Sequence, residues 1–369
     1  MVEKKIRISG MTILAVIITF LFCSCSTSVT VSSYSDGPYI FYRDSTAGVI
    51  TFDRLLNPDT TYFSQKELGS LTLRSEFDSI SCPALELQIK DKITGSEAEN
   101  VLPAKLIAIS DIEGNFEKLY KLLKANKVID KNYNWIFGQG HLVIVGDLVD
   151  RGDYVTQCLW LIYKLEEEAT RAGGKVQYLL GNHDRMIMSG DDRYVSEKYH
   201  PLFDRLKVKA SDLYSASTEF GRWMRTKNAV AQAGNIVFVH GGLSHELLEK
   251  DLTIADINSA VQKEIDKADP ESDEAKFLFS KYGILWYRGL IQDYGEYKKI
   301  TEDKLDEVLN KYSAETVVIG HCVMDSVSAD FSGKAIRIDV DHYEKAQGLL
   351  IDNGIFYAVD ENGNRRRLK

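Results

Sequence analysis

Acidic, amide and imidazole side chains follow five short apolar runs of the chain, each time together with glycine. These side chains bind hard or borderline divalent cations, and glycine lets the backbone approach a ligand closely. A single cluster of this kind is weak evidence for a metal site, because it is more often a turn with a hydrogen-bonded histidine. Five in succession are hard to explain by packing, since a buried charge without a partner is costly. The clusters are Ser110-Asp-Ile-Glu-Gly-Asn115, Gly146-Asp-Leu-Val-Asp-Arg-Gly152, Gly181-Asn-His-Asp184, His240-Gly-Gly242 and Gly320-His-Cys322.

The apolar runs predict the strands that position these clusters. Runs that are apolar throughout indicate strands buried on both faces, as in a layered α/β sheet. Between them, apolar residues at three- and four-residue steps predict helices. Catalytic groups in such sheets lie in the loops beyond the carboxyl ends of the strands. The expected strands are 106–109, 142–145, 176–180, 236–239 and 316–319, and the expected helices are 116–123, 156–168 and 304–312.

The segment before these strands has a different pattern. Short alternating runs at 39–42, 48–52 and 84–89 are separated by Gly, Pro, Asn and Asp, which is typical of strands and turns. We expect a small β-rich addition over 39–100, followed by the main domain over 101–360. The length of 369 residues allows one large domain with additions, or two domains.

Composition excludes some classes of partner. The net charge of −9 argues against nucleic acid and anionic membrane surfaces, because nothing neutralises many phosphates at once. A hydrophobic content of 44% is ordinary for a soluble globular protein with a sizeable core. The oligomeric state does not follow from the sequence.

The first residues predict export. Lys4, Lys5 and Arg7 precede an apolar run over 11–22 that is too short to span a bilayer comfortably. The run ends at Cys25, and a Ser/Thr-rich tether over 26–38 follows. This arrangement resembles a bacterial lipoprotein signal, which implies cleavage before an acylated Cys25 and a lipid anchor in the bacterial envelope, in the periplasm or at the outer membrane. A plain cleaved signal and a short uncleaved anchor are the alternatives.

The order of the polar clusters points to a known family. The stretches GDLVDRG, GNHD and VHGGLS resemble the calcineurin-like metallophosphoesterase superfamily, in its phosphoprotein-phosphatase branch, over about 105–354. The stretches at 190–195, 221–228 and 285–289 are similar to bacterial and plant Shewanella-like phosphatases. The resemblance implies an αββα sandwich, two divalent metal ions and a phosphate-ester substrate. Residues of about 186–225 are expected to form a helical cap.

The resemblance also implies the metal ligands. Two divalent ions about 3.5–4 Å apart share a carboxylate and a hydroxide that attacks phosphorus. The chain departs from the family at Glu113, where the family has histidine, and an added carboxylate favours Mn²⁺ or Mg²⁺ over Fe or Zn. Cys322 stands where the family has threonine. The implied ligands are Asp111 and Glu113 for the first ion, Asp147 as the bridge, and Asn182, His240 and His321 for the second ion.

Four further residues carry implied catalytic roles. Arg151 and Arg288 would hold the non-attacked phosphate oxygens, since a guanidinium group pairs two oxygens at once. His183 would protonate the leaving oxygen, and Asp150 would orient its ring. Stacking on a neighbouring aromatic ring is the alternative for Arg288.

Three functions follow as hypotheses. The first is a metal-dependent phosphatase acting on phosphomonoesters, phosphoprotein side chains included. The second is a nucleotide or dinucleoside-polyphosphate hydrolase, which shares the same centre. The third is a non-catalytic lipoprotein that binds phosphate or a partner; Glu113 favours it, whereas the proton donor His183 opposes it, because a binding protein needs none.

Overall fold

The structure is a computed structural model, and the described residues are 30–34, 36–78, 80–291 and 297–369. The expected signal segment, the tether up to residue 29 and Cys25 lie outside the described residues. Within the described ranges, no helix combines the length and the apolar character that crossing a membrane requires.

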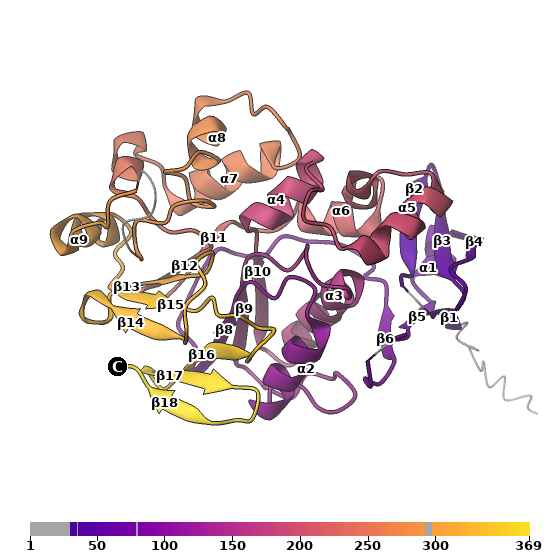
Figure 1. Cartoon of the computed structure of the whole chain (residues 1–369), viewed down its shortest axis with the longest axis horizontal. Coiled ribbons are helices and arrows are strands. Elements are labelled where there is room, and N and C mark those ends of the chain that lie inside the picture. Colours follow the sequence, from indigo (N-terminus) through magenta and orange to yellow (C-terminus); the bar gives the residue numbers. More distant parts are fainter. Residues whose placement is uncertain (1–29, 35, 79, 292–296) are drawn as a thin grey trace, which may run out of the picture.

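Two six-stranded sheets form the centre of the molecule (Figure 1). The first sheet has the order β10-β9-β8-β16-β17-β18 and the second has the order β14-β15-β13-β12-β11-β7. The strands of the first sheet are β10 (Lys175–Leu179), β9 (His141–Val145), β8 (Lys105–Ile109), β16 (Gln347–Asp352), β17 (Ile355–Asp360) and β18 (Arg365–Arg367). Those of the second are β14 (Ser328–Asp330), β15 (Ala335–Arg337), β13 (Thr316–Ile319), β12 (Ile236–Val239), β11 (Val230–Ala233) and β7 (Glu99–Asn100).

Alternate residues of the central strands enter two separate apolar clusters. In β8, Leu106 and Ala108 join one cluster, and Ile107 and Ile109 join the other. The first cluster also contains Phe238 of the second sheet, so it fills the space between the two sheets. The second cluster contains the apolar faces of helices, among them α2 (Phe116–Ala125) and α3 (Val155–Arg171). The layered α/β sandwich predicted from the continuous apolar runs is therefore confirmed.

The expected strands and helices of the main domain are all present, with ends that shift by up to three residues. Helix α9 (Glu302–Lys311) begins two residues earlier than predicted, because the Thr301 side chain caps it by accepting from the backbone N–H of Lys304. The hairpin of β16 and β17 and the last strand β18 are additional to the predicted strands. The helices α7 (Ile254–Glu264) and α8 (Asp273–Leu278) lie above the second sheet in Figure 1.

The N-terminal residues form two small sheets at one end of the molecule, coloured indigo in Figure 1. One contains β2 (Tyr39–Arg43), β3 (Thr46–Phe52) and β4 (Pro58–Ser64); the other contains β1 (Thr30–Ser33), β5 (Thr72–Ser75) and β6 (Leu85–Gln88). Buried polar contacts attach this region to the rest of the protein. The Tyr42 hydroxyl donates to Glu219 at 2.5 Å, and Lys90 pairs with Glu166. The Lys90 N–H also donates to the Tyr163 hydroxyl at 2.9 Å, and that hydroxyl in turn donates to Glu219.

The segment expected as a cap is helical. It contains the second half of α4 (Asn182–Ser189), then α5 (His200–Leu206) and α6 (Glu219–Met224), with the short 3-10 helices η1 (Glu197–Tyr199) and η2 (Ala210–Tyr214) between them. Helix α5 lies beside the N-terminal strands in Figure 1. The boundaries of the addition, the main domain and the cap remain predictions.

Candidate active site

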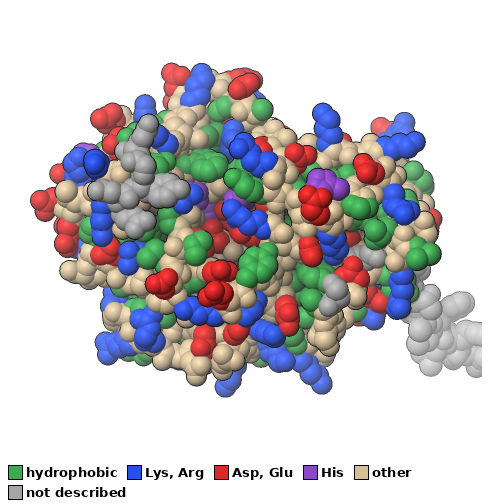
Figure 2. Space-filling model, viewed as in Figure 1, with side chains coloured by type: hydrophobic (Ala, Val, Ile, Leu, Met, Phe, Trp, Pro, Cys, Tyr) green, Lys and Arg blue, Asp and Glu red, His purple; other side chains and the backbone are tan. Residues whose placement is uncertain are grey.

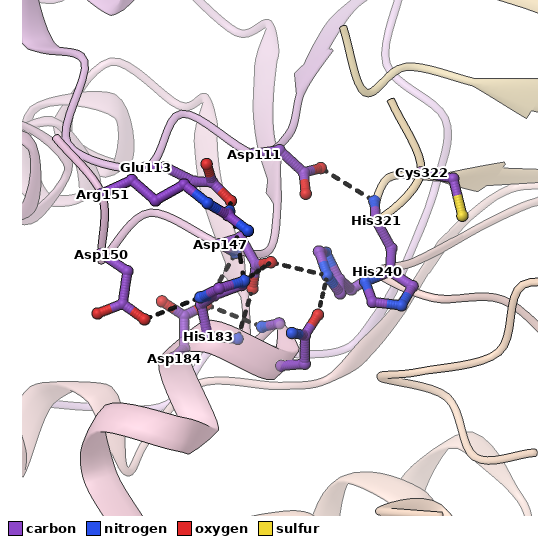
Figure 3. A network of polar contacts seen from close by, with 12 residues as sticks. Asp111, Glu113, Asp147, Asp150, Arg151, His183, Asp184, His240, His321 and Cys322 are labelled. Carbon is purple, nitrogen blue, oxygen red and sulfur yellow. Dashed lines mark hydrogen bonds and ion pairs between the residues drawn. The ribbon is translucent and has the colours of Figure 1, made fainter. Parts of the chain in front are cut away.

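The carboxyl ends of five strands converge on one cleft of about 670 Å³. Figure 3 shows the polar side chains that project from the loops after β8, β9, β12 and β13 and from the first turn of α4, which follows β10. On the face drawn in Figure 2, acidic, basic and histidine side chains come together near the centre. Five of the six predicted metal ligands line the cleft, and His240 lies fully buried against Asp147 and Asn182.

The loops that carry these side chains have unusual backbone conformations. The left-handed region is sparsely populated by residues other than glycine, and such residues cluster at functional sites. Glycine is required where two chain segments approach: a Cβ on Gly181 would lie 2.0 Å from Asp147 Oδ1, and one on Gly320 would lie 2.4 Å from Asp111 Oδ2. Positive φ angles are found at six site residues: Asp111 (52°), Glu113 (45°), Asp147 (52°), Asp150 (74°), Arg151 (56°) and His321 (66°).

One group of ligand atoms is arranged as a metal site. Asp147, His240 and His321 each offer an atom within 4.8 Å of the other two, and all three side chains are buried. His240 Nε2 lies 3.1 Å from Asp147 Oδ2 and 2.8 Å from Asn182 Oδ1. Its Nδ1 lies 2.9 Å from the carbonyl oxygen of Val145, which fixes the ring so that Nε2 faces the carboxylate.

The two histidines of this group have opposite electrostatic environments. Burial lowers the pKa of His240, but Asp147 and Asp111 outweigh it and raise the pKa to about 10. Burial, with His240 and Arg288 beside it, lowers the pKa of His321 well below its usual value. His321 Nε2 is buried and has no hydrogen-bond partner among the described residues. A neutral, unpartnered imidazole nitrogen beside a carboxylate fits a divalent cation, so these residues suit the implied metal.

Glu113 belongs to a second group. Its carboxylate, Asp147 and His183 place ligand atoms within 4.8 Å of one another, so an oxygen donor stands where the resemblance implies the first ion. The carboxylate also forms an ion pair with Arg151, whose guanidinium lies 5.2 Å from the centre of the Tyr194 ring. Glu113 therefore does two things in this chain: it offers a metal ligand and it holds a predicted phosphate-binding arginine.

Asp111, which follows β8, is held by the loop after β13 of the other sheet. Its Oδ2 accepts a hydrogen bond of 3.1 Å from the backbone N–H of His321. Burial raises the pKa of Asp111 to about 6, with a further increase from the charge of Asp147 and a decrease from His240. A carboxylate that is costly to ionise when buried is stabilised by a nearby cation. Asp111 lies outside both groups that meet the 4.8 Å limit.

The predicted general acid and its partner are in contact. His183 Nδ1 lies 2.8 Å from Asp150 Oδ2, and both residues are buried. Burial lowers the pKa of His183, but Asp147 and Asp150 raise it above the usual histidine value. Nε2 is thereby left for a leaving group, 4.0 Å from Asp147 Oδ2. Asp184 is involved elsewhere, because it accepts from the backbone of Asp147 and from two further donors, the Gly181 N–H and the Tyr178 hydroxyl.

The second predicted arginine reaches the cleft from the segment between α8 and α9. Arg288 Nη1 donates to the carbonyl oxygen of His321 at 3.0 Å and contacts Cys322 Sγ at 3.2 Å. Burial raises the pKa of the Cys322 thiol to about 11, so the thiol stays protonated at neutral pH. These contacts hold the guanidinium beside His321, the last of the predicted metal ligands.

The cleft contains residues to which the sequence assigned no role. Tyr194, Trp286 and Tyr343 supply aromatic walls, and Asp339 supplies a buried carboxylate, 3% exposed. The signal for Asp339 was weak, because the residues before it, 335–338, are apolar except for Arg337. The aromatic residues stand in loops, where no periodicity marks them.

The comparisons with known proteins agree with this site. Residues 104–324 match the calcineurin-like phosphoesterase family, which is more than half of the chain. The chain belongs to the calcineurin-like phosphoesterase family. It is therefore a phosphoesterase of a family that uses divalent metal ions.

Two relatives and one solved structure show which phosphatases the chain resembles. The chain is 31% identical over 221 residues to Shewanella-like protein phosphatase 1 of Plasmodium berghei, which covers 59% of this chain and 60% of that protein. It is 27% identical over 282 residues to Shewanella-like protein phosphatase 2 of Arabidopsis thaliana, covering 64% and 71%. The crystal structure of a cold-active protein-tyrosine phosphatase of a psychrophilic Shewanella species superimposes with a TM-score of 0.81 at 30% identity, over 90% of this chain and 99% of that one. These matches confirm the resemblance to Shewanella-like phosphatases.

Proposed function

We propose that the protein is a metal-dependent phosphomonoesterase that hydrolyses aryl phosphates, with phosphotyrosine in proteins as the substrate class. The observation that carries this is the convergence of a metal-ligand cluster with the His183–Asp150 pair inside one cleft. A proton donor beside a metal site serves catalysis, since binding alone requires no donor. The similar Shewanella protein is a protein-tyrosine phosphatase, which supports the substrate class.

The site residues have different roles in the proposed reaction. Arg151 and Arg288 line the cleft and pair with phosphate oxygens, which places phosphorus next to Asp147. Asp111, Glu113, Asn182, His240 and His321 complete the ligand set with Asp147. When bound there, two divalent ions, Mn²⁺ by preference, would neutralise phosphate charge and lower the pKa of water. His183 gives its Nε2 proton to the oxygen that leaves phosphorus, while Asp150 keeps the ring oriented.

The walls of the cleft favour an aryl leaving group. Tyr194 and Trp286 line it near the two arginines, and Tyr343, 60% exposed, stands at its edge. Aromatic rings contact an aryl group face to edge or in offset stacks, which adds to the burial of its surface. Tyrosinate is a much poorer leaving group than nitrophenolate, so its departure gains from the proton that His183 supplies.

One assay tests the proposal. The purified protein should hydrolyse 4-nitrophenyl phosphate and phosphotyrosine peptides, with activity that rises with Mn²⁺ and is lost with chelator. A substrate panel with phosphoserine peptides, nucleotides and dinucleoside tetraphosphate decides the substrate class. Full activity of a double variant His240→Ala and Asp147→Asn would show that this cleft is not the catalytic site.

We also propose that the protein is exported and held at the bacterial envelope by acylated Cys25. The charge order before the apolar run 11–22 and the cysteine at its end support this. The phosphate esters that it meets would then be those outside the cytoplasm.

A further inference from the structure

The general acid is backed by a small cavity that the proposed mechanism does not use. Asp150 lines it, together with apolar side chains from α4 and the cap and with Tyr39 of the N-terminal region. About 20 Å³ of the cavity is open to a water molecule, which is room for one. Three elements far apart in the sequence therefore meet behind the His183–Asp150 pair.

Asp150 is bonded to the general acid through one oxygen. Oδ2 accepts from His183, whereas Oδ1 is buried and has no hydrogen-bond partner among the described residues. Figure 3 shows this second oxygen on the side of Asp150 that faces away from His183. A buried carboxylate oxygen without a donor is costly, so a donor is expected close to it.

The tyrosines of the cavity wall are the candidate donors. The Tyr39 hydroxyl contacts Asp36 Oδ1 at 2.5 Å and Thr156 Oγ1 at 3.0 Å. The Tyr199 hydroxyl lies 2.9 Å from the Val155 nitrogen, from which it accepts, and donates to a backbone carbonyl.

Tyr214 is the remaining tyrosine. Its ring lines the same cavity and is 8% exposed, and its hydroxyl forms no hydrogen bond with the described residues. Burial raises the pKa of the Tyr214 phenol, and the charge of Asp150 raises it further, more than that of any other group. The phenol thus stays protonated, and Tyr214 and Asp150 line one and the same cavity.

We propose that Tyr214 is a positioning residue for the general acid: its hydroxyl donates to Asp150 Oδ1, directly or through one water molecule in the cavity, and so fixes the carboxylate that orients His183. This inference rests on the proposed function. It gives the cap a task in the chemistry, because η2 carries Tyr214. Asp36 Oδ2 is the competing acceptor, since it too is buried without a hydrogen bond and Lys198 Nζ is 3.5 Å away.

The leaving-group dependence of turnover tests the role. In Tyr214→Phe, kcat for phenyl phosphate should fall about 10-fold, as is usual when an outer partner of a site is removed. Turnover of 4-nitrophenyl phosphate should change little, because nitrophenolate leaves without a proton. Tyr39→Phe is the matched control: it removes a hydroxyl from the same cavity wall without changing the ratio of the two rates. If the ratio of kcat for phenyl phosphate to kcat for 4-nitrophenyl phosphate is the same in Tyr214→Phe as in Tyr39→Phe, the inference is overturned.

The outcomes separate this inference from the proposed function. A wild-type protein that hydrolyses neither aryl phosphate refutes the proposed function itself. A crystal structure of the wild type that resolves water tests the contact whatever the activity, and also if Tyr214→Phe does not fold. We expect the Tyr214 hydroxyl, or a single water bonded to it, within hydrogen-bond distance of Asp150 Oδ1. A hydroxyl bonded to Asp36 instead would overturn the positioning role.

Discussion

Replacing Asp150 by asparagine should separate proton donation from phosphate binding. The substitution preserves the volume of the side chain but removes the charge that lies 2.8 Å from His183 Nδ1. A hydrogen bond to a charged group contributes about 1.5–3 kcal/mol. At 1.36 kcal/mol for each factor of ten, the loss corresponds to a reduction of about 10- to 150-fold in the step that needs the proton. His183→Ala removes the donor itself and should cost about 10²- to 10⁴-fold.

The assay compares two aryl phosphates that differ only in their leaving groups. With phenyl phosphate, kcat of Asp150→Asn should fall by the full factor, whereas 4-nitrophenyl phosphate should be hydrolysed at nearly the wild-type rate. Asp184→Asn is the matched control, since Asp184 is buried and adjacent to His183 but does not contact its ring. The reduction in kcat caused by Asp184→Asn should be the same for both substrates. Equal losses for both substrates in Asp150→Asn would refute the assignment of the general acid.

The pH dependence of the same variant has a defined sign. His183 acts in its protonated form, and its pKa in the folded protein lies above the usual value because the carboxylates outweigh burial. Activity on phenyl phosphate is therefore present below that pKa and is lost as the pH rises through it. Without the Asp150 charge, burial lowers the pKa, so the alkaline limit of kcat should move to lower pH. An unchanged limit would contradict the reasoning.

Three other predictions concern the contact between the N-terminal region and the main domain, the metal site and the lipid anchor. Glu219→Ala leaves the hydroxyls of Tyr42 and Tyr163 without their acceptor and should lower the free energy of unfolding in urea by about 2–4 kcal/mol. An unchanged midpoint of the urea transition would contradict the stabilising role of these contacts. Gly181→Ala would bring a Cβ to 2.0 Å from Asp147 Oδ1, the predicted bridging ligand, so Mn²⁺ affinity by calorimetry should fall about 10-fold or more. An affinity equal to that of the wild type would argue against the metal site. Cys25→Ala should abolish labelling by palmitate and release the protein from membranes; retained labelling would place the acyl group elsewhere.

Much of the fold could be predicted because the central strands are distinct apolar runs in the sequence. The run 142–145 is apolar throughout, which occurs only where a strand is covered on both faces, and β9 is buried between the two layers. The polar residues directly after it could then be placed at the edge of the sheet. The hairpin of β16 and β17 was missed, although residues 347–352 are apolar at their centre, because no polar cluster with a family motif follows them.

The details of the site could not be predicted, because they depend on long-range contacts. The sequence indicated Glu113 as a ligand but gave no sign of its ion pair with Arg151, which depends on the left-handed conformation of both residues. The contact of the N-terminal region with α3 and α6 likewise depends on single tyrosine hydroxyls, because Lys90 N–H donates to Tyr163 and Tyr42 donates to Glu219. Tyr214 carries no motif and becomes visible only as part of a cavity wall.

The central claim is that six side chains from separate strands hold two divalent ions that catalysis requires. Metal content measured by mass spectrometry, on the same samples as phosphatase activity, tests it most directly. We predict two Mn²⁺ per active chain, loss of both metal and turnover after dialysis against chelator, and recovery of both on adding Mn²⁺; in His240→Ala the metal content should stay below two. Undiminished turnover by chain that carries no metal would contradict the account.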